Sequence, residues 1–507
     1  MTVGRPRSTT DVRSTAAIAL VCTAWLAALS GETRPPAGEA RTAAYLESIR
    51  RDPVALRAFL FELPKGADLH LHLSGAVYAE SYLAWAADAA LCVDLTRETY
   101  VEALVSSEGV RCANAGERPA SDVLTHPDLY GRLVDALSMR HHDPSRGPDE
   151  SRFFSTFDRF LPIWRGGGVG SERVTARALA EVSSRAERQH VRHLEIILGL
   201  DDGTPARLAT EVPWPSAEDF SRYRQALLDG GLRDLVPRRR RWLDDVERET
   251  EEVLACRTTP APPGCGISRR YIATVLRALS PAQVFAQMLF AFELASSDAR
   301  VVAVNPVQPE DWFVPRRDYD LHLRMFAFMH ARYPGVRISL HAGELTLGQV
   351  PPSELGQHVR KAVEAGFASR IGHGVDVLYD PHADELLRDM ASRRIGVEIN
   401  FTTNEQILGV SGPRHPFRHY MRAGVPVTIS TDDEGVARTD ITHEYQRAVE
   451  EHGASYAELK RISRNGLEQS FLPAEERTRL TTALEAAFVA FESRTWGAAT
   501  PTRPPGP

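Results

Sequence analysis

The chain has 507 residues, of which 43% are hydrophobic and 25% are charged. This composition is typical of a globular protein and excludes a disordered, collagen-like or coiled-coil chain. The formal charge of −7, from 60 basic and 67 acidic side chains, argues against a nucleic acid polymer as a partner.

Residues 1–30 have the pattern of a secretory signal peptide. Arg5, Arg7 and Arg13 precede an apolar run over residues 16–29, and Ala28-Leu-Ser30 is a small-x-small cleavage site. The apolar run is too short to span a bilayer comfortably, so we expect no stable membrane anchor. The sequence therefore predicts an exported protein, periplasmic or secreted.

Cleavage would remove Cys22 and leave Cys92, Cys112, Cys256 and Cys265. An even number of cysteines in an exported protein indicates disulfides, and four cysteines allow three connectivities. Local pairing of Cys92 with Cys112 and of Cys256 with Cys265 is favoured, because each pair flanks a loop-like stretch. The alternative is four buried thiols.

Residues 42–63 predict a helix, and strand-like segments then alternate with amphipathic ones. Most strand candidates are apolar and β-branched, as in strands buried on both faces. They predict an α/β fold, a parallel (β/α)8 TIM barrel over residues 31–492. The strand candidates are 67–73, 191–198, 271–276, 301–307, 336–341, 370–375, 396–401 and 426–431, with helices expected at 281–296, 318–333 and 353–365.

Two spacings between strands are too long for a minimal barrel. Insertions are therefore expected after the first strand, near 91–150, and between the second and third strands, near 201–268. The second insertion contains a predicted helix around 238–254, whose four leading arginines precede many acidic residues. A solvated helix end explains that charge pattern better than an anion site does. Residues 493–507 are rich in Pro and Gly and predict a frayed tail.

The first chemical signal is His70-Leu-His72 in the first predicted strand. Residues i and i+2 of a strand point to one face, so these two imidazoles project together. They make half of a metal site, although an H-x-H pair alone is more often incidental.

Three further motifs lie at the ends of later predicted strands. His341 and Glu344 belong to SLHAGE, and His373 lies between two glycines in RIGHGV. Asp432 and Asp433 are adjacent carboxylates, which repel each other unless a cation lies nearby. Alone, each motif fits a packed histidine, a turn histidine or a solvated acidic loop.

Together the motifs point to one site, because barrel active sites are built at the C-terminal ends of strands. Three imidazoles and a carboxylate suit zinc and leave a position for water. Zinc lowers the pKa of that water, and a histidine and a glutamate remain for proton transfer. The sequence therefore predicts a hydrolytic site with one zinc ion per chain.

In this order and spacing, PKGADLHLHLSGA, SLHAGE, RIGHGV and STDDE resemble the adenosine deaminase family of the amidohydrolase superfamily. The resemblance covers residues 42–490. The signal peptide and the cysteines of the first insertion resemble the secreted, growth-factor-related branch. Supporting positions are Asn404, His415-Pro416, Glu444-Tyr445, Asn465 and Ser470-Phe471.

The resemblance implies roles for the motif residues. Glu344 would protonate N1 of a purine, His373 would orient and deprotonate the attacking water, and Asp433 would hydrogen-bond N7. Attack at C6 would convert adenosine or 2′-deoxyadenosine, a small-molecule purine nucleoside, to inosine or 2′-deoxyinosine and ammonia. The implied zinc ligands are His70, His72, His341 and Asp432.

Some positions depart from the family's usual pattern. Ser74 stands where an aspartate near the ribose is common, which leaves the preferred nucleoside open. Gln308 stands where a glycine often contacts the base, and its own N–H can serve the same purpose. The expected substrate contacts are therefore Ser74, Gln308, Gly343 and Asp433.

Two other functions are compatible with the sequence. One is a deaminase of another 6-aminopurine or of a modified adenosine. The other is an exported nucleoside-binding or signalling protein without turnover, which the complete set of chemical residues argues against. Binuclear relatives bridge two metals with a carboxylated lysine; none of Lys65, Lys361 and Lys460 lies on a predicted central strand, which favours one metal.

Overall fold

The computed structural model describes residues 1–2, 4, 37–101, 104–106, 109–164, 170–215 and 219–494. Nearly all of the expected signal peptide and of the expected tail lies outside these residues. Across the described part of the chain, every helix is too short or too polar to cross a membrane.

Eight parallel strands form the central sheet and follow one another in chain order. The predicted α/β barrel is confirmed, and every predicted strand overlaps an observed one. Their apolar side chains are buried on both faces, which is why the pattern was continuous rather than alternating. The strands are β1 (Lys65–His72), β7 (Val191–Leu198), β8 (Ser268–Leu276), β9 (Val301–Val307), β10 (Arg337–Ala342), β11 (Arg370–His373), β12 (Gly396–Ile399) and β13 (Val427–Ile429).

The barrel is nearly closed, because β1 and β13 meet beyond the end of β13. Leu71 pairs with Asp432 in an isolated parallel bridge. The N–H of Asp432 donates to the carbonyl of His70 at 2.8 Å, and the N–H of His72 donates to the carbonyl of Asp432 at 3.0 Å. The seam of the barrel therefore joins two of the predicted metal-binding segments directly.

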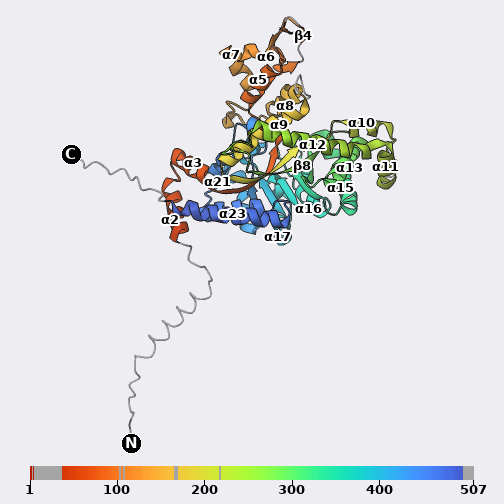
Figure 1. Ribbon diagram of the computed structural model, residues 1–507. Helices are drawn as coiled ribbons and strands as arrows, with labels where there is room; N and C mark the ends of the chain where they lie inside the picture. The colour runs from red at the N-terminus through yellow and green to blue at the C-terminus, as the bar shows by residue number, and fades with distance from the viewer. Residues whose placement is uncertain are drawn as a thin grey trace, which may run out of the picture.

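Helices cover the outside of the barrel (Figure 1). Between β8 and β9, for example, α13 begins with a capping box of Ser280 and Gln283 and packs against both strands. At the ends of the chain, the N-terminal α2 packs against the C-terminal α23. The covering helices include α2 (Ala37–Ile49), α3 (Pro53–Glu62), α9 (Ser171–Arg188), α13 (Pro281–Ser297), α15 (Tyr319–Arg332), α16 (His358–Glu364), α17 (Ala383–Arg393), α18 (Phe401–Leu408), α19 (Phe417–Ala423), α20 (Glu434–Ala437), α21 (Ile441–Glu450), α22 (Tyr456–Glu468) and α23 (Ala474–Ser493).

Three sequence-based expectations differ from the structure. Residues 42–63 form two helices, because Asp52 caps a new helix that starts at Pro53. The helix expected at 353–365 starts only at His358, because Gly356 has a φ of +74°. Lys65 does lie on a central strand, as the first residue of β1, where its Nζ donates to three backbone carbonyls within 3.0 Å. It sits at the strand end opposite the site.

Both long spacings contain additional structure. The first one, between β1 and β7, forms the uppermost part of Figure 1. Its helices are α5 (Ala79–Asp88), α6 (Ala120–Val123), α7 (Pro127–Ala136) and α8 (Glu150–Trp164). It also contains an antiparallel sheet of β2 (Cys92–Asp94), β3 (Thr99–Val101) and β6 (Glu117–Pro119), and the strand pair β4 (Leu104–Ser106) and β5 (Gly109–Arg111). The second one contains α10 (Thr204–Glu211), α11 (Phe220–Leu227) and α12 (Arg233–Val253).

The four cysteines form the two local disulfides that the sequence favoured. Cys92 bonds to Cys112 across a separation of 20 residues, and Cys256 bonds to Cys265 across 9 residues. The first disulfide ties β2 to the residue after β5, and the second closes the turn between α12 and β8. Each disulfide closes a loop within an insertion, and none of the four cysteines lies on a barrel strand.

Candidate active site

Three histidines and one aspartate bring their ligand atoms together at the C-terminal mouth of the barrel. The Nε2 atoms of His70 and His72 lie 3.1 and 3.2 Å from Nε2 of His341. They lie 3.5 and 3.4 Å from Oδ1 of Asp432. Ligand atoms bound to one tetrahedral zinc ion are about 3.3 Å apart, given zinc–nitrogen bonds of about 2.0 Å. The observed spacing therefore fits a single ion.

Hydrogen bonds behind two of the imidazoles determine which nitrogen carries the hydrogen. Nδ1 of His70 lies 2.6 Å from Oε2 of Glu398, and Nδ1 of His341 lies 2.6 Å from Oδ1 of Asn305. Both oxygens accept, so each Nδ1 donates and each Nε2 keeps its lone pair. The two Nε2 atoms are 3.1 Å apart, and both face the position that a metal ion would take.

A buried ion-pair network holds the carboxylate behind His70. Arg370 lies 2.5 Å from Glu398 and 2.7 Å from Glu195, and all three side chains are fully buried. Burial raises the pKa of Glu398, but Arg370 and His70 outweigh burial and lower the pKa to about 2. Glu398 is therefore ionised and remains an acceptor for His70.

Strained backbone and a close glycine position the remaining groups. Asp432 has a φ of +58° and His373 a φ of +67°, a region that residues other than glycine seldom adopt. Thr403 donates to Oδ2 of Asp432 at 2.6 Å, which leaves Oδ1 to the histidines. A Cβ at Gly372 would lie 2.7 Å from the ring of His70, so only glycine fits there.

Glu344, His373 and Asp433 are buried beside the four ligands. His373 lies 3.6 Å from Glu344 and 3.9 Å from Asp432. Burial, reinforced by the Asp432 carboxylate, raises the pKa of Glu344 and of Asp433 well above their usual range. Burial also lowers the pKa of His373 to about 3. The arrangement thus combines two carboxyls that can donate protons with one neutral imidazole.

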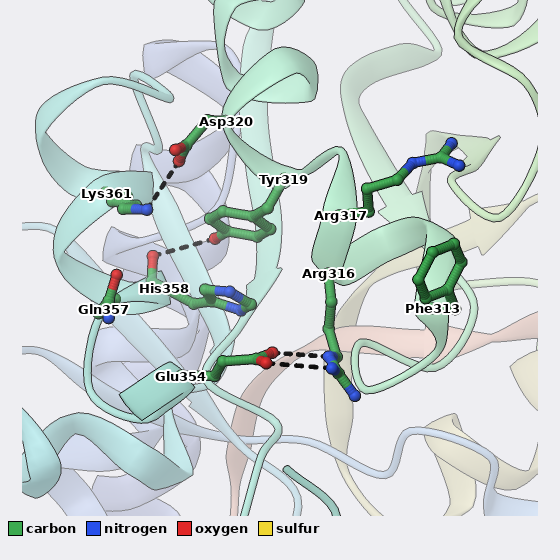
Figure 2. A pocket seen from close by; sticks show the side chains of 9 residues that line it. All are labelled: Phe313, Arg316, Arg317, Tyr319, Asp320, Glu354, Gln357, His358 and Lys361. Atoms are coloured by element: carbon green, nitrogen blue, oxygen red, sulfur yellow. Dashed lines mark hydrogen bonds and ion pairs between the residues drawn. The ribbon is translucent and has the colours of Figure 1, made fainter. Parts of the chain in front are cut away.

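The buried carboxylate of Glu310 holds the loop that carries Glu344. Glu310 accepts from the N–H groups of Gly343 and Glu344 at 3.2 and 2.8 Å. It also lies 2.5 Å from Nδ1 of His358, whose ring stacks on Tyr319 at the edge of a surface hollow (Figure 2). Glu344 is therefore anchored through its backbone, and its carboxyl is left for the site.

The other expected substrate contacts have partners within the protein. The carbonyl of Ser74 accepts from the hydroxyl of Tyr82 at 2.6 Å, and the side chain of Gln308 accepts from the N–H of Ala278 at 2.8 Å. The N–H of Gly343 is occupied by the carboxylate described above. Contacts of these three residues with a substrate stay predictions.

Sequence reasoning did not identify the residues that support the ligands. A signal was present, because Arg370 and Glu398 are charged residues within short apolar strands, and a charge buried in a strand needs a partner. Which ligand each one supports depends on contacts between distant strands. The missed residues are Glu195, Asn305, Glu310, Arg370, Glu398 and Thr403.

Residues 246–487 match the sequence model of a family described as Adenosine deaminase. The adenosine deaminase of Shewanella loihica is 38% identical over 157 residues, which are 31% of this chain and 44% of that protein. The adenosine deaminase of Pectobacterium atrosepticum is 34% identical over 188 residues, which are 37% of this chain and 51% of that protein. By sequence, residues 246–487 of this chain therefore belong to the adenosine deaminase family. It spans about half the length of the curated relatives that it matches.

Solved structures share the fold of this chain. An adenine deaminase from Arthrobacter aurescens matches with a TM-score of 0.54 at 16% identity, over 84% of this chain and 99% of that chain. An N6-methyl-AMP deaminase from Arabidopsis thaliana matches with a TM-score of 0.54 at 19% identity, over 86% and 99%. At these identities the likeness shows the fold alone.

Replacing Glu398 tests the support behind His70. Glu398→Gln should weaken zinc binding by about 10- to 100-fold, because a neutral amide holds His70 less firmly and leaves Arg370 with one carboxylate. Competition with a chelator measures the affinity, and circular dichroism checks the fold. Glu444→Gln is the matched control, since this buried carboxylate binds Thr402 and Thr439 instead of a ligand. Unchanged affinity in Glu398→Gln would contradict the assignment.

Proposed function

We propose that this protein is a zinc-dependent deaminase that hydrolyses adenosine or 2′-deoxyadenosine to inosine or 2′-deoxyinosine and ammonia. The observation that carries the proposal is the convergence of four ligand atoms beside a buried glutamate and a buried histidine. The two bacterial relatives named adenosine deaminase support the choice of substrate.

The donor set is the basis for the choice of metal. His70, His72, His341 and Asp432 would hold one zinc ion, because three imidazoles and one carboxylate suit this ion better than magnesium or calcium, which prefer oxygen ligands. When bound, zinc supplies a nucleophile at neutral pH by lowering the pKa of water.

The chain's own residues would carry the proton transfers. Glu344 protonates N1 of the purine, since its raised pKa keeps the carboxyl protonated. Asp433 donates to N7 for the same reason, and His373 orients the attacking water. The water oxygen bonds to C6, and the bond from C6 to the amino group breaks. One water proton leaves with ammonia, and the other restores Glu344.

A deaminase of another 6-aminopurine or of a modified adenosine is the second candidate. Ser74 stands where the family often has an aspartate near the ribose, which leaves the preferred nucleoside open. Proteins that share the fold include an adenine deaminase and an N6-methyl-AMP deaminase. A nucleoside-binding protein without turnover ranks below both, because Glu344, His373 and Asp433 are all in place.

A panel of substrates tests the proposed reaction. Zinc-loaded protein should release ammonia from adenosine and 2′-deoxyadenosine with a higher kcat/KM than from adenine or N6-methyl-AMP. Ammonia and bound zinc are measured on the same sample. Preference for adenine or N6-methyl-AMP would assign the second candidate, and zinc-loaded protein that binds adenosine without releasing ammonia would favour the binding protein.

Two variants separate metal binding from proton donation. Glu344→Gln should keep zinc and lose turnover by about 10²- to 10⁴-fold, because only the proton donor is removed. His341→Ala should lose zinc itself, as measured by atomic emission. The matched control is Glu354→Gln, which should keep normal zinc content and turnover. Glu354 pairs with Arg316 in the surface hollow of Figure 2. Full activity in Glu344→Gln would remove Glu344 from the mechanism.

We also propose that the protein is exported through residues 1–30. The two disulfides support this, because such bonds persist in oxidising compartments. The protein recovered from outside the cytoplasm should begin near residue 31 and show no thiol that reacts with an alkylating agent before reduction. Intact mass measurement checks both points. A retained N-terminus or alkylated cysteines would contradict export.

A further inference from the structure

A chain of hydrogen bonds runs toward His373 from the backbone at the start of α19. The N–H of Phe417 donates to Nδ1 of His415 at 3.1 Å. A backbone N–H only donates, so Nδ1 of His415 carries no hydrogen and the ring's hydrogen lies on Nε2. That Nε2 lies 3.1 Å from Oδ1 of Asn404, which accepts it. The side-chain amide of Asn404 is thereby oriented, with its oxygen toward His415.

The opposite side of this amide faces the active site. Nδ2 of Asn404 lies 2.9 Å from Nδ1 of His373, and Nδ2 of Asn400 lies 3.5 Å from the same atom. Two amide donors converge on this one nitrogen, so it accepts and carries no hydrogen. The neutral ring of His373 then has its hydrogen on Nε2.

Nε2 of His373 points toward the metal site. It lies 3.9 Å from Oδ2 of Asp432, and its ring is 4.9 Å from the ring of His70 and 5.1 Å from the ring of His341, between centroids. Within the described part of the chain, this nitrogen has no hydrogen-bond partner, although the residue is only 1% exposed. A buried N–H without an acceptor is costly, and a water oxygen in the site would satisfy it.

We propose that Asn404 and His415 are positioning residues that fix His373 as its Nε2–H tautomer, so that His373 faces the attacking water as a hydrogen-bond donor. This inference rests on the proposed deaminase function. The sequence-based expectation was that His373 orients the water and also removes its proton. An Nε2 that already carries hydrogen cannot accept a proton, so His373 only orients the water, by donating to a lone pair of its oxygen.

Two helices hold the groups that fix the tautomer of His373. Asn404 lies on α18, and the first donor of the chain, the N–H of Phe417, opens α19. His415 is buried, and its ring packs 5.0 Å from that of Phe401. Reversing the tautomer therefore requires a change in the chemistry of Asn404 or His415.

Asn404→Asp makes that change with almost no change in shape. A carboxylate cannot donate, so it accepts from Nδ1 of His373 and reverses the tautomer, while His415 still donates to it. We expect kcat to fall by about 10²-fold with little change in KM, as when a preorganised donor is removed from an active site. The direct readout is the ¹⁵N NMR signal of Nε2 of His373 in zinc-loaded protein, assigned with His373→Gln.

The wild-type protein should show a protonated Nε2 and an unprotonated Nδ1 at His373, and Asn404→Asp should show a protonated Nδ1. His415→Gln is the conservative variant, because its amide can donate to Asn404 and accept from Phe417; it should keep the wild-type tautomer and most of the turnover. A wild-type His373 with hydrogen on Nδ1 would overturn the proposal, as would an unchanged tautomer and kcat in Asn404→Asp. The NMR measurement needs no turnover, so it distinguishes failure of this inference from failure of the deaminase function.

Discussion

The structure depends on one electrostatic constraint: imidazole lone pairs are directed at a common point inside a nearly closed barrel. Nδ1 of His70 and of His341 is engaged by an oxygen acceptor, so each ring, when neutral, directs its Nε2 lone pair at that point. A cation there is favourable, so the fold prepares the site for a metal ion. The buried Arg370 and Glu398 pair keeps this geometry fixed, since neither charge can reach water.

The way the barrel closes explains why the ligands meet there. The short β13 ends before the mouth, and the chain that follows it pairs with β1 through the backbone of Asp432. The same hydrogen bonds that complete the barrel therefore hold Asp432 in a left-handed conformation next to His70 and His72. Barrel closure and the placement of Asp432 share these backbone hydrogen bonds, so we expect damage to the seam to reduce stability and metal affinity together.

The sequence was sufficient for the strands and for the four residues that meet at the candidate metal site, because each motif ends a buried strand and strand ends share one face of a barrel. It was less informative about helix boundaries that single residues determine. At Pro53 and Gly356 the structure breaks helices that the apolar pattern predicted as continuous. The supporting residues could not be predicted from the sequence, since partners such as Glu398 and His70 are separated by 328 residues. The role of His373 depends on the direction of its hydrogen bonds. That direction follows from the fold, which places the side-chain amide of Asn404 between the rings of His373 and His415.

The added structure of the first insertion lies close to this machinery. The N–H of Asp149, just before α8, donates to the carbonyl of Gln406 on α18 at 2.8 Å, and the N–H of Met139 donates to the carbonyl of Val436 on α20 at 2.7 Å. Those two helices also carry Asn404 and Glu434. The insertion is thus fastened to the elements that set the tautomer of His373 and that follow Asp433, while its own disulfide limits its unfolding.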